Sequence, residues 1–353
     1  MTVFIREHVG PDAMGFLARQ WNNLYAEDEL ATPFQSSAWL TAWARHLPHT
    51  ATPIVLAATS PSGRVLAALA LASHTGPGRT RILPLSAPHA ECVRPVGPHA
   101  DDTTVAQALA FHLLLASDGG AEVVMTDMPA TSAMGSFLIA LCKDTGWDST
   151  ATTCAVIPLP VHYARLPPST QRQHARRRRT WARLAHNRTI TYSRTRHTQD
   201  LLNAFDTLFQ LHQQPWEGHD PLPGSLQASE YDRWQAIVRD LSATNACIAS
   251  LAVEATVIAA QLLLTRGTHC YSLIPAMNLA HRHLAPGHAL LRHLIDDLAS
   301  EGFRTLDLGR TTGPQEPFKR SYGPLWTSTV SALSTSHGAA ASGNRCASSA
   351  ASL

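Results

Sequence analysis

The feature that most constrains the fold is an order of elements that occurs twice along the chain. Each half is predicted to contain a strand, two helices, three strands, a helix and a strand. In the first half, the helix after Asp101-Asp102-Thr103 leads to a strand at 122–126, and in the second half, the helix that begins near Pro286-Gly287 leads to a strand at 303–308. Element order repeats while residue identity does not. The pattern predicts an α/β (α+β) protein with two similar cores, each a mixed central sheet flanked by helices.

Length and composition fit this duplication. The chain has 353 residues, of which 44% are hydrophobic, and this is enough for two cores and excludes general disorder. We predict a first core at 1–165, an arginine-rich helical segment at 166–188 and a second core at 189–333. The tail at 334–353 is rich in Ser, Ala and Gly and lacks periodicity, so we expect it to be disordered.

The composition also disfavours several classes of protein. No apolar run approaches the roughly 20 residues of a membrane helix, and the first residues lack the pattern of a secretory signal. The six cysteines have no C-x-x-C spacing, which argues against a disulfide scaffold and a zinc ribbon. His281 and His283 have no second set of ligands at helical spacing, so no metal site is predicted. We expect a cytoplasmic protein without a membrane partner, a metal or a resident cofactor.

Charge is distributed unevenly along the chain. The 51 residues from Ser149 to Gln199 contain ten arginines and no Asp or Glu. Six of these arginines form a stripe at helical spacing: Arg172, Arg176, Arg177, Arg178, Arg179 and Arg183. Like charges at this spacing repel, so the stripe predicts a polyanionic partner such as a nucleic acid. The alternative is a solvated face that packs against the acidic remainder. Trp181 interrupts the stripe, and either base stacking or core packing would suit it.

The doubled order and several short patterns resemble the GNAT acyltransferase core used twice, as in Fem-type transferases and the Fem-like acetyltransferase group. The patterns are Thr32 to Leu40 (TPFQSSAWL), Leu211-His212 with Trp216-Glu217-Gly218, Ala259-Ala260-Gln261, Pro286-Gly287, Asp307-Leu308-Gly309 and Phe318-Lys319. They span about residues 1 to 330. The resemblance implies acyl transfer on a splayed pair of strands, without a Ser-His-Asp nucleophile. The chain departs from the family at Phe318, where Tyr is usual, and at Met277-Asn278, where an aromatic-acidic pair is common.

In GNAT folds, a glycine-containing turn before a helix binds the pyrophosphate of CoA. The corresponding turn in the second half runs from Arg282 to Gly287, with Ala285 at the first glycine position and Pro286, which lacks an amide donor. In the first half, Asp101 and Asp102 lie where phosphates would bind. Both turns are therefore poorly suited to binding CoA. The alternative for Pro286-Gly287 is an ordinary helix start with no role in binding. The other donor, aminoacyl-tRNA, is the one that Fem-type proteins use.

The resemblance also implies roles for residues of the second half. Lys319 would stabilise a developing oxyanion and Asp307 would act as a base for the acceptor amine; a surface lysine and a loop-binding carboxylate are the alternatives. The donor-binding candidates are the six arginines of the stripe with Gln261, Arg282 and Arg310. The acceptor-binding candidates are His212, Trp216, Glu217 and Tyr271, of which His212 also fits a core position.

The primary hypothesis is therefore an amide-forming aminoacyltransferase. It would transfer an aminoacyl group from aminoacyl-tRNA to the amine of a small metabolite or peptide, in natural-product or cell-wall-type biosynthesis. One alternative is an acyl-CoA-dependent N-acyltransferase with the same fold. The other is a non-catalytic nucleic-acid-binding protein on a GNAT-like scaffold. The partners would be tRNA and a small-molecule amine, and the chain would be a monomer or a homodimer.

Overall fold

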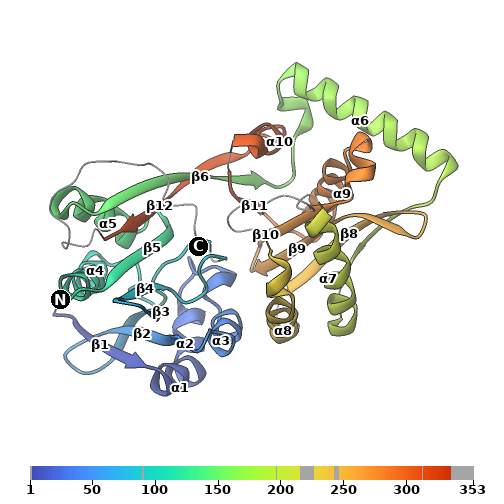
Figure 1. Ribbon diagram of the computed structural model, residues 1–353. Helices are drawn as coiled ribbons and strands as arrows, with labels where there is room; N and C mark the ends of the chain where they lie inside the picture. The colour runs from blue at the N-terminus through green and yellow to red at the C-terminus, as the bar shows by residue number, and fades with distance from the viewer. Residues whose placement is uncertain are drawn as a thin grey trace, which may run out of the picture. The chain divides into compact units, whose positions relative to one another are not determined.

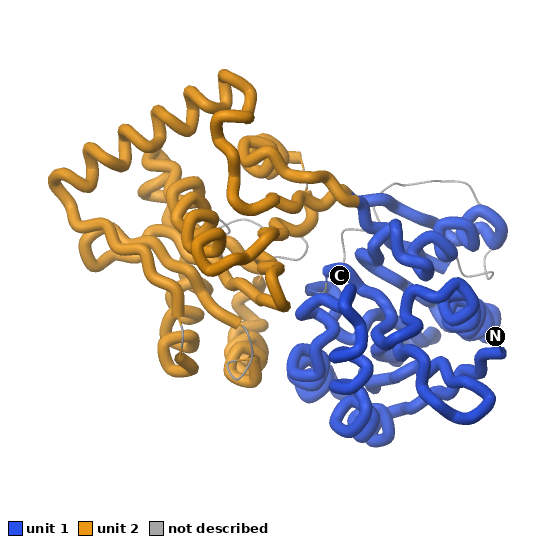
Figure 2. Tube along the Cα trace, turned by 180° about the vertical axis from the view of Figure 1, so that it is seen from behind, with its two compact units in different colours: residues 1–152, 328–353 blue, residues 153–327 orange. Residues whose placement is uncertain are grey.

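The computed structural model describes residues 2–89, 91–195, 197–214, 226–241, 246–311 and 313–334. The chain divides into two compact units (Figure 2). Unit 1 comprises Met1–Thr152 with Ser328–Leu353, and unit 2 comprises Thr153–Thr327. No helix in these described ranges combines the length and the apolar character needed to cross a membrane. The tail that was expected to be disordered lies, from residue 335 on, outside the described residues.

The unit boundaries differ from those predicted because two strands pair far from their neighbours in sequence. Strand β6 (Asp148–Pro158) pairs with β11 (Thr305–Arg310) of unit 2, so residues 153–165 belong to that unit. Strand β12 (Leu325–Leu333) pairs with β5 (Glu122–Pro129) of unit 1, so residues 328–333 belong there. Each unit thus takes part of one strand from the other half of the sequence, which periodicity alone does not indicate.

Unit 1 contains a mixed sheet with the strand order β1-β2-β3-β4-β5-β12, in which only the β4–β5 pair is parallel. Helices α4 and α5 cover one face through a cluster that includes Leu109, Leu113 and Leu138 (Figure 1). The remaining elements are β1 (Phe4–Val9), α1 (Pro11–Arg19), α2 (Trp21–Glu27), η1 (Pro33–Gln35), α3 (Ser37–Arg45), β2 (Ala51–Thr59), β3 (Val65–Gly76), β4 (Arg79–Pro84), α4 (Thr103–Asp118) and α5 (Ala133–Thr145).

Unit 2 repeats this arrangement with the strand order β6-β11-β10-β9-β8-β7, in which only β10–β11 is parallel. Helix α9 buries Leu291, Leu294 and Leu298 against one face of the sheet, while α7 contacts β8, β9 and β10. The remaining elements are η2 (Tyr163–Arg165), α6 (Pro168–Asn187), β7 (Ile190–Arg194), α7 (Thr198–Gln213), η4 (Ala228–Glu230), α8 (Tyr231–Leu241), β8 (Ala246–Val253), β9 (Thr256–Arg266), β10 (His269–Met277), η5 (Leu279–Leu284), α9 (Pro286–Ser300), η6 (Gly313–Gln315) and α10 (Glu316–Arg320).

The predicted fold class is confirmed. Both units have the order strand, helices, three strands, helix, strand, with three helices (α1, α2 and α3) after the first strand of unit 1 where two were predicted, and two (α7 and α8) in unit 2; both carry helices against a mixed sheet. In each unit, a long helix connects the two strands of the parallel pair: α4 connects β4 to β5 in unit 1, and α9 connects β10 to β11 in unit 2. In α/β folds, the carboxyl ends of parallel strands are where ligands commonly bind, which directs attention to these two pairs.

Candidate functional site

The parallel strands of unit 2 diverge after three paired positions. The β10–β11 ladder runs from the pair His269–Thr305 to the pair Tyr271–Asp307, although β10 continues to Met277 and β11 to Arg310. A bulge between Ser272 and Ile274 interrupts the pairing of β10 with β9 directly beyond the last pair. A bulge leaves one residue of its strand outside the ladder. The two strands thus form a fork beyond the Tyr271–Asp307 pair, where the parallel ladder ends.

The corresponding fork in unit 1 is filled by the chain itself. Strands β4 and β5 pair only at Arg81–Glu122 and Ile82–Val123. Beyond these pairs, the Val93 N–H donates to the Asp127 carbonyl of β5 (3.0 Å), and Val96 exchanges two 2.8 Å backbone hydrogen bonds with Ala68 of β3. The segment 93–96 thus occupies the space between the strands, and the fork of unit 2 is the better candidate for a site.

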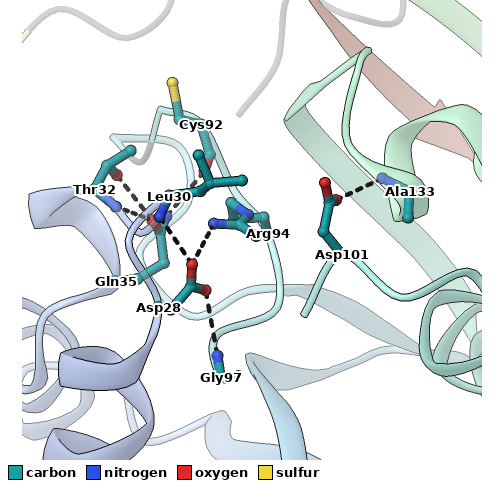
Figure 3. Close-up of polar contacts among 9 residues, drawn as sticks. All are labelled: Asp28, Leu30, Thr32, Gln35, Cys92, Arg94, Gly97, Asp101 and Ala133. Atoms are coloured by element: carbon teal, nitrogen blue, oxygen red, sulfur yellow. Dashed lines mark hydrogen bonds and ion pairs between the residues drawn. The ribbon is translucent and has the colours of Figure 1, made fainter. Parts of the chain in front are cut away.

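Buried polar contacts hold this filling segment in place (Figure 3). Arg94 Nη1 lies 3.0 Å from Asp28 Oδ1, and both side chains are about 5% exposed or less. Asp28 Oδ2 also accepts from the Gly97 N–H (3.2 Å). Gln35 donates to the Cys92 carbonyl (2.9 Å), while its Oε1 accepts from the Thr32 N–H (2.8 Å). Thr32 and Gln35 belong to the TPFQSS pattern of the family resemblance. This pattern therefore anchors the segment that fills the fork between β4 and β5.

Carboxylates accept from backbone amides at the starts of α4 and α5 in unit 1. Asp102 Oδ1 accepts from the N–H groups of Thr104 (2.8 Å) and Val105 (3.3 Å) at the start of α4. Asp101 Oδ1 accepts from the Ala133 N–H at the start of α5 (2.8 Å; Figure 3). These amides are the groups that would bind a phosphate at a helix N-terminus. In unit 1 they are already used by the carboxylates that the sequence placed there.

The turn before α9 in unit 2 has a different character. Ala285 adopts a left-handed conformation (φ 51°) that glycine favours, and no side chain caps the helix. A Cβ atom added at Gly287 would meet nothing within 4 Å. Arg282 and His283 are exposed beside it. The turn thus has one left-handed residue and open space at Gly287, while Pro286 lacks an amide donor.

The end of β11 contains both candidate catalytic residues. Asp307 pairs with Tyr271 at the last position of the parallel ladder, and its Oδ1 accepts from the Gly309 N–H (2.7 Å). Burial raises the pKa of Asp307, and the Gly309 hydrogen bond and the Lys319 charge oppose this rise only in part. A carboxyl group with a raised pKa is a better proton acceptor than a fully solvated one.

Lys319 is held by the backbone. Its ammonium donates to the carbonyls of Leu308 (2.6 Å), Gly309 (3.1 Å) and Arg310 (2.5 Å), and the side chain is buried. An ammonium has three N–H donors, and it meets three backbone carbonyls here. This geometry favours a role in fixing the end of β11 over direct contact with a reacting carbonyl. Arg310 takes part through its own carbonyl.

Two further candidates make contacts within unit 2. Gln261 on β9 is buried and donates to Ser272 on β10, beside the bulge. His212 Nε2 lies 3.3 Å from the Leu226 N–H, and its Nδ1 lies 3.2 Å from the Pro275 carbonyl. Because an amide can only donate, we assign the proton to Nδ1. His212 therefore joins α7 to the outer end of β10, while Trp216 and Glu217 lie outside the described residues.

The arginine stripe lies on α6, and five of its six arginines are open to solvent. Arg172, Arg176, Arg178, Arg179 and Arg183, here called the α6 ridge, are exposed. Across the described ranges, none of them forms an ion pair with a carboxylate of the chain. The Trp181 side chain donates to the Leu284 carbonyl (2.9 Å) in the turn before α9. Packing thus accounts for Trp181, and the ridge lies on a helix attached to that turn.

Two features of this region are not evident from the sequence. Arg177 belongs to the stripe but is half-buried on the packing side of α6. His174, three residues earlier, is buried against Tyr163 and Tyr322, with ring centroids 5.0 and 5.1 Å away. His174, Arg177 and Trp181 are spaced three and four residues apart, so they lie on one face of α6. Assigning Trp181 to the core would therefore have predicted that His174 and Arg177 also lie on the packed face.

Comparisons with known proteins agree with this geometry. Residues 169–320 match the family model of an acetyltransferase (GNAT) domain. FemX has 13% identity with the chain and a TM-score of 0.58, and the match covers 88% of this chain and 95% of FemX. A C-terminal domain from Agrobacterium fabrum, assigned to a lysylphosphatidylglycerol synthetase, has 14% identity and a TM-score of 0.56 over 91% of this chain and 92% of that domain.

A tandem GNAT protein from the clavulanic acid biosynthesis pathway has 14% identity and a TM-score of 0.53, with 96% of this chain and all of that chain (100%) covered. No curated protein sequence matches the chain. At these identities the structural matches establish the fold alone, and the family model is a match to residues 169–320. Residues 169–320 are thus similar to an acetyltransferase (GNAT) domain, and the whole chain shares its fold with FemX and a tandem GNAT protein.

Proposed function

We propose that the protein is an aminoacyltransferase that passes an aminoacyl group from aminoacyl-tRNA to the amine of a small metabolite or peptide. The observation that carries this proposal is the α6 ridge, which is exposed and lacks carboxylate partners in the described parts of the chain. Five guanidinium groups on one helix repel one another, and RNA phosphates relieve this repulsion with release of counterions. The helix is tied to the turn before α9 by Trp181, so RNA on the ridge would present its acylated end to the fork.

The transfer needs few groups. The acceptor nitrogen attacks the ester carbonyl, a C–N bond forms, and the C–O bond to the terminal ribose breaks. The amine loses a proton to a base, and the ribose oxygen leaves with a proton. We propose Asp307 as the base, because it lies at the apex of the fork and burial raises its pKa. Tyr271, its partner across the ladder, would line the acceptor side. Lys319 would hold the end of β11 for this reaction.

A second candidate function is acyl-CoA-dependent N-acylation at the same fork. The left-handed conformation of Ala285 and the open space at Gly287 favour it, since both preserve the shape of a phosphate turn. The filled fork of unit 1 is compatible with either donor, because each needs only one site. The two functions differ in whether the α6 ridge is required.

The decisive experiment compares two double variants that remove the same charge. One is Arg176→Gln with Arg179→Gln on the ridge, and the other is Arg6→Gln with Arg64→Gln, at exposed positions of unit 1. We expect the ridge variant to weaken binding of charged tRNA and to lower the slope of log K against log salt by about 2, and the control to match the wild type. Amide formation that survives ribonuclease treatment and requires acyl-CoA would refute the proposal in favour of the second candidate. RNA binding without any aminoacyl transfer would point to a non-catalytic protein.

A further inference from the structure

Helix α10 contacts two parts of unit 2 that the proposed function uses (Figure 1). Lys319, in its last turn, donates to three carbonyls at the end of β11, the strand that carries Asp307. Directly after the helix, the Ser321 carbonyl lies 2.8 Å from His174 Nε2 on α6. Helix α10 therefore joins the helix of the α6 ridge to the strand of the candidate base.

Helix α10 is too short to hold its own place. It has five residues, and isolated helices shorter than about 12 residues are marginal in water. Its position therefore depends on its contacts with the rest of unit 2. The Ser321 N–H donates to the Phe318 carbonyl (3.2 Å). The Tyr322 N–H donates to the Lys319 carbonyl (3.1 Å). Because Ser321 is fixed to the end of the helix in this way, a group that holds Ser321 also holds Lys319.

His174 has one hydrogen-bond donor, and it is directed at this turn. The side chain is buried, and the ring centroids of Tyr163 and Tyr322 lie 5.0 and 5.1 Å from its own. Because a carbonyl only accepts hydrogen bonds, we assign the proton of the ring to Nε2. Burial lowers the pKa of His174, although the Ser321 hydrogen bond opposes this fall, so the ring is neutral at neutral pH. The neutral ring gives its single N–H to the Ser321 carbonyl.

The ammonium that this turn holds acts on Asp307. Burial raises the pKa of Asp307, and the Gly309 hydrogen bond and the Lys319 charge oppose the rise. The neighbouring Cys270 adds no charge at neutral pH, because burial raises the pKa of its thiol. The effect of one charge on another falls with the distance between them. A displacement of α10 away from β11 would therefore change the strength of Asp307 as a base.

We propose that His174 is a positioning residue for the transfer reaction: its hydrogen bond to the Ser321 carbonyl ties α10 to α6 and holds the Lys319 ammonium beside Asp307. His174 itself touches no reacting atom and acts through Ser321 and Lys319. The inference rests on the proposed function only in taking Asp307 as the base, and it holds for either acyl donor.

The first test measures the pKa of Asp307 in the full-length protein, by NMR of the carboxyl carbons of labelled aspartates, with Asp307→Asn to assign the signal. His174→Phe keeps a buried ring and removes the donor, so the pKa of Asp307 should rise by about 0.5 or more, a roughly threefold fall in its acid dissociation constant. His174→Gln keeps an N–H donor at a similar reach and should stay within about 0.2 of the wild-type value. Trp181→Phe is the matched control and should also match the wild type, because it removes a hydrogen bond from α6 to the Leu284 carbonyl, outside α10.

A double variant tests whether His174 acts through Lys319. Lys319→Met should raise the pKa of Asp307 at least as much as His174→Phe does, and the two changes together should raise it no further than Lys319→Met alone. Circular dichroism checks folding, and His174→Asn, whose amide is too short to reach Ser321, replaces His174→Phe if that variant unfolds. An unchanged pKa in the folded variant, equal changes in His174→Phe and Trp181→Phe, or additive changes in the double variant would overturn the proposal.

The pH dependence of kcat/KM then separates this inference from the proposed function. With charged tRNA as the donor, the acid limb should move to higher pH in His174→Phe and return in His174→Gln. An acid limb that stays in place in an active enzyme would overturn the inference, because Asp307 would then not be the base. A raised pKa of Asp307 in His174→Phe, in a protein that transfers no aminoacyl group, would support the position of His174 and refute the proposed donor.

Discussion

Lys319 directs its three N–H groups to the carbonyls of Leu308, Gly309 and Arg310, at the end of the strand that carries Asp307. We predict that Lys319→Met lowers the free energy of unfolding by about 3 kcal/mol, because hydrogen bonds to a charged donor are lost and buried carbonyls remain unpaired. Urea denaturation measures this change. The control is Arg320→Met, whose guanidinium is exposed and should matter by less than about 1 kcal/mol. Lost activity with unchanged stability would instead identify Lys319 as a group that acts on the substrate.

Asp28 and Arg94 form a buried ion pair beside the segment that fills the fork of unit 1. We predict that Asp28→Asn destabilises the protein by about 3 kcal/mol or more, because it leaves Arg94 buried without its counter-charge. Asp12→Asn is the matched control, since the Asp12 carboxylate is 62% exposed and contacts only His8 in the described residues. Denaturant unfolding that shows equal changes for the two variants would mean that the buried pair does not hold the segment.

Among the elements, the contact of α6 with α9 predicts a dependence of stability on pH. Burial lowers the pKa of His288 to about 3 and also lowers the pKa of His174, against an ordinary value near 6.5. Between these values the unfolded chain binds protons that the folded chain does not, so stability falls as the pH falls below about 6.5. For His288 the slope approaches about 1.4 kcal/mol per pH unit as the pH falls below 6.5, and His174 adds to it in the same direction. His288→Gln should reduce this slope in urea denaturation at pH 5 to 7, and an unchanged slope would contradict the assignment.

The sequence predicts elements better than it predicts their partners. Three predicted elements are present because their signals are local. They are the arginine-rich helix, the apolar helix after Asp102 and the strand that carries Gln261, and the signals are helical spacing, a helix cap and an apolar run. The filling of the first fork was not predictable. The segment 93–96 has no periodic pattern, and its hydrogen bonds reach Ala68 and Asp127, each about 30 residues away. The inward direction of Arg177 was hidden for the same reason, since it depends on which face of α6 packs.

The arrangement of strands in the whole molecule determines where the chain can be divided. A division at the predicted boundary, after residue 165, would separate β11 from β6, although Thr305, Leu306 and Asp307 pair with Pro158, Ile157 and Val156. We predict that a fragment of residues 153–327 unfolds cooperatively on heating, because it retains the β11 pairs with β6 and β10. A fragment of residues 166–333 should lack a cooperative transition and aggregate, since β11 becomes an unpaired edge next to a buried cluster. Circular dichroism during heating, with light scattering, distinguishes them. Equal cooperativity in both fragments would show that β6 is dispensable, and the strand exchange would then contribute little to the stability of the unit that carries the candidate site.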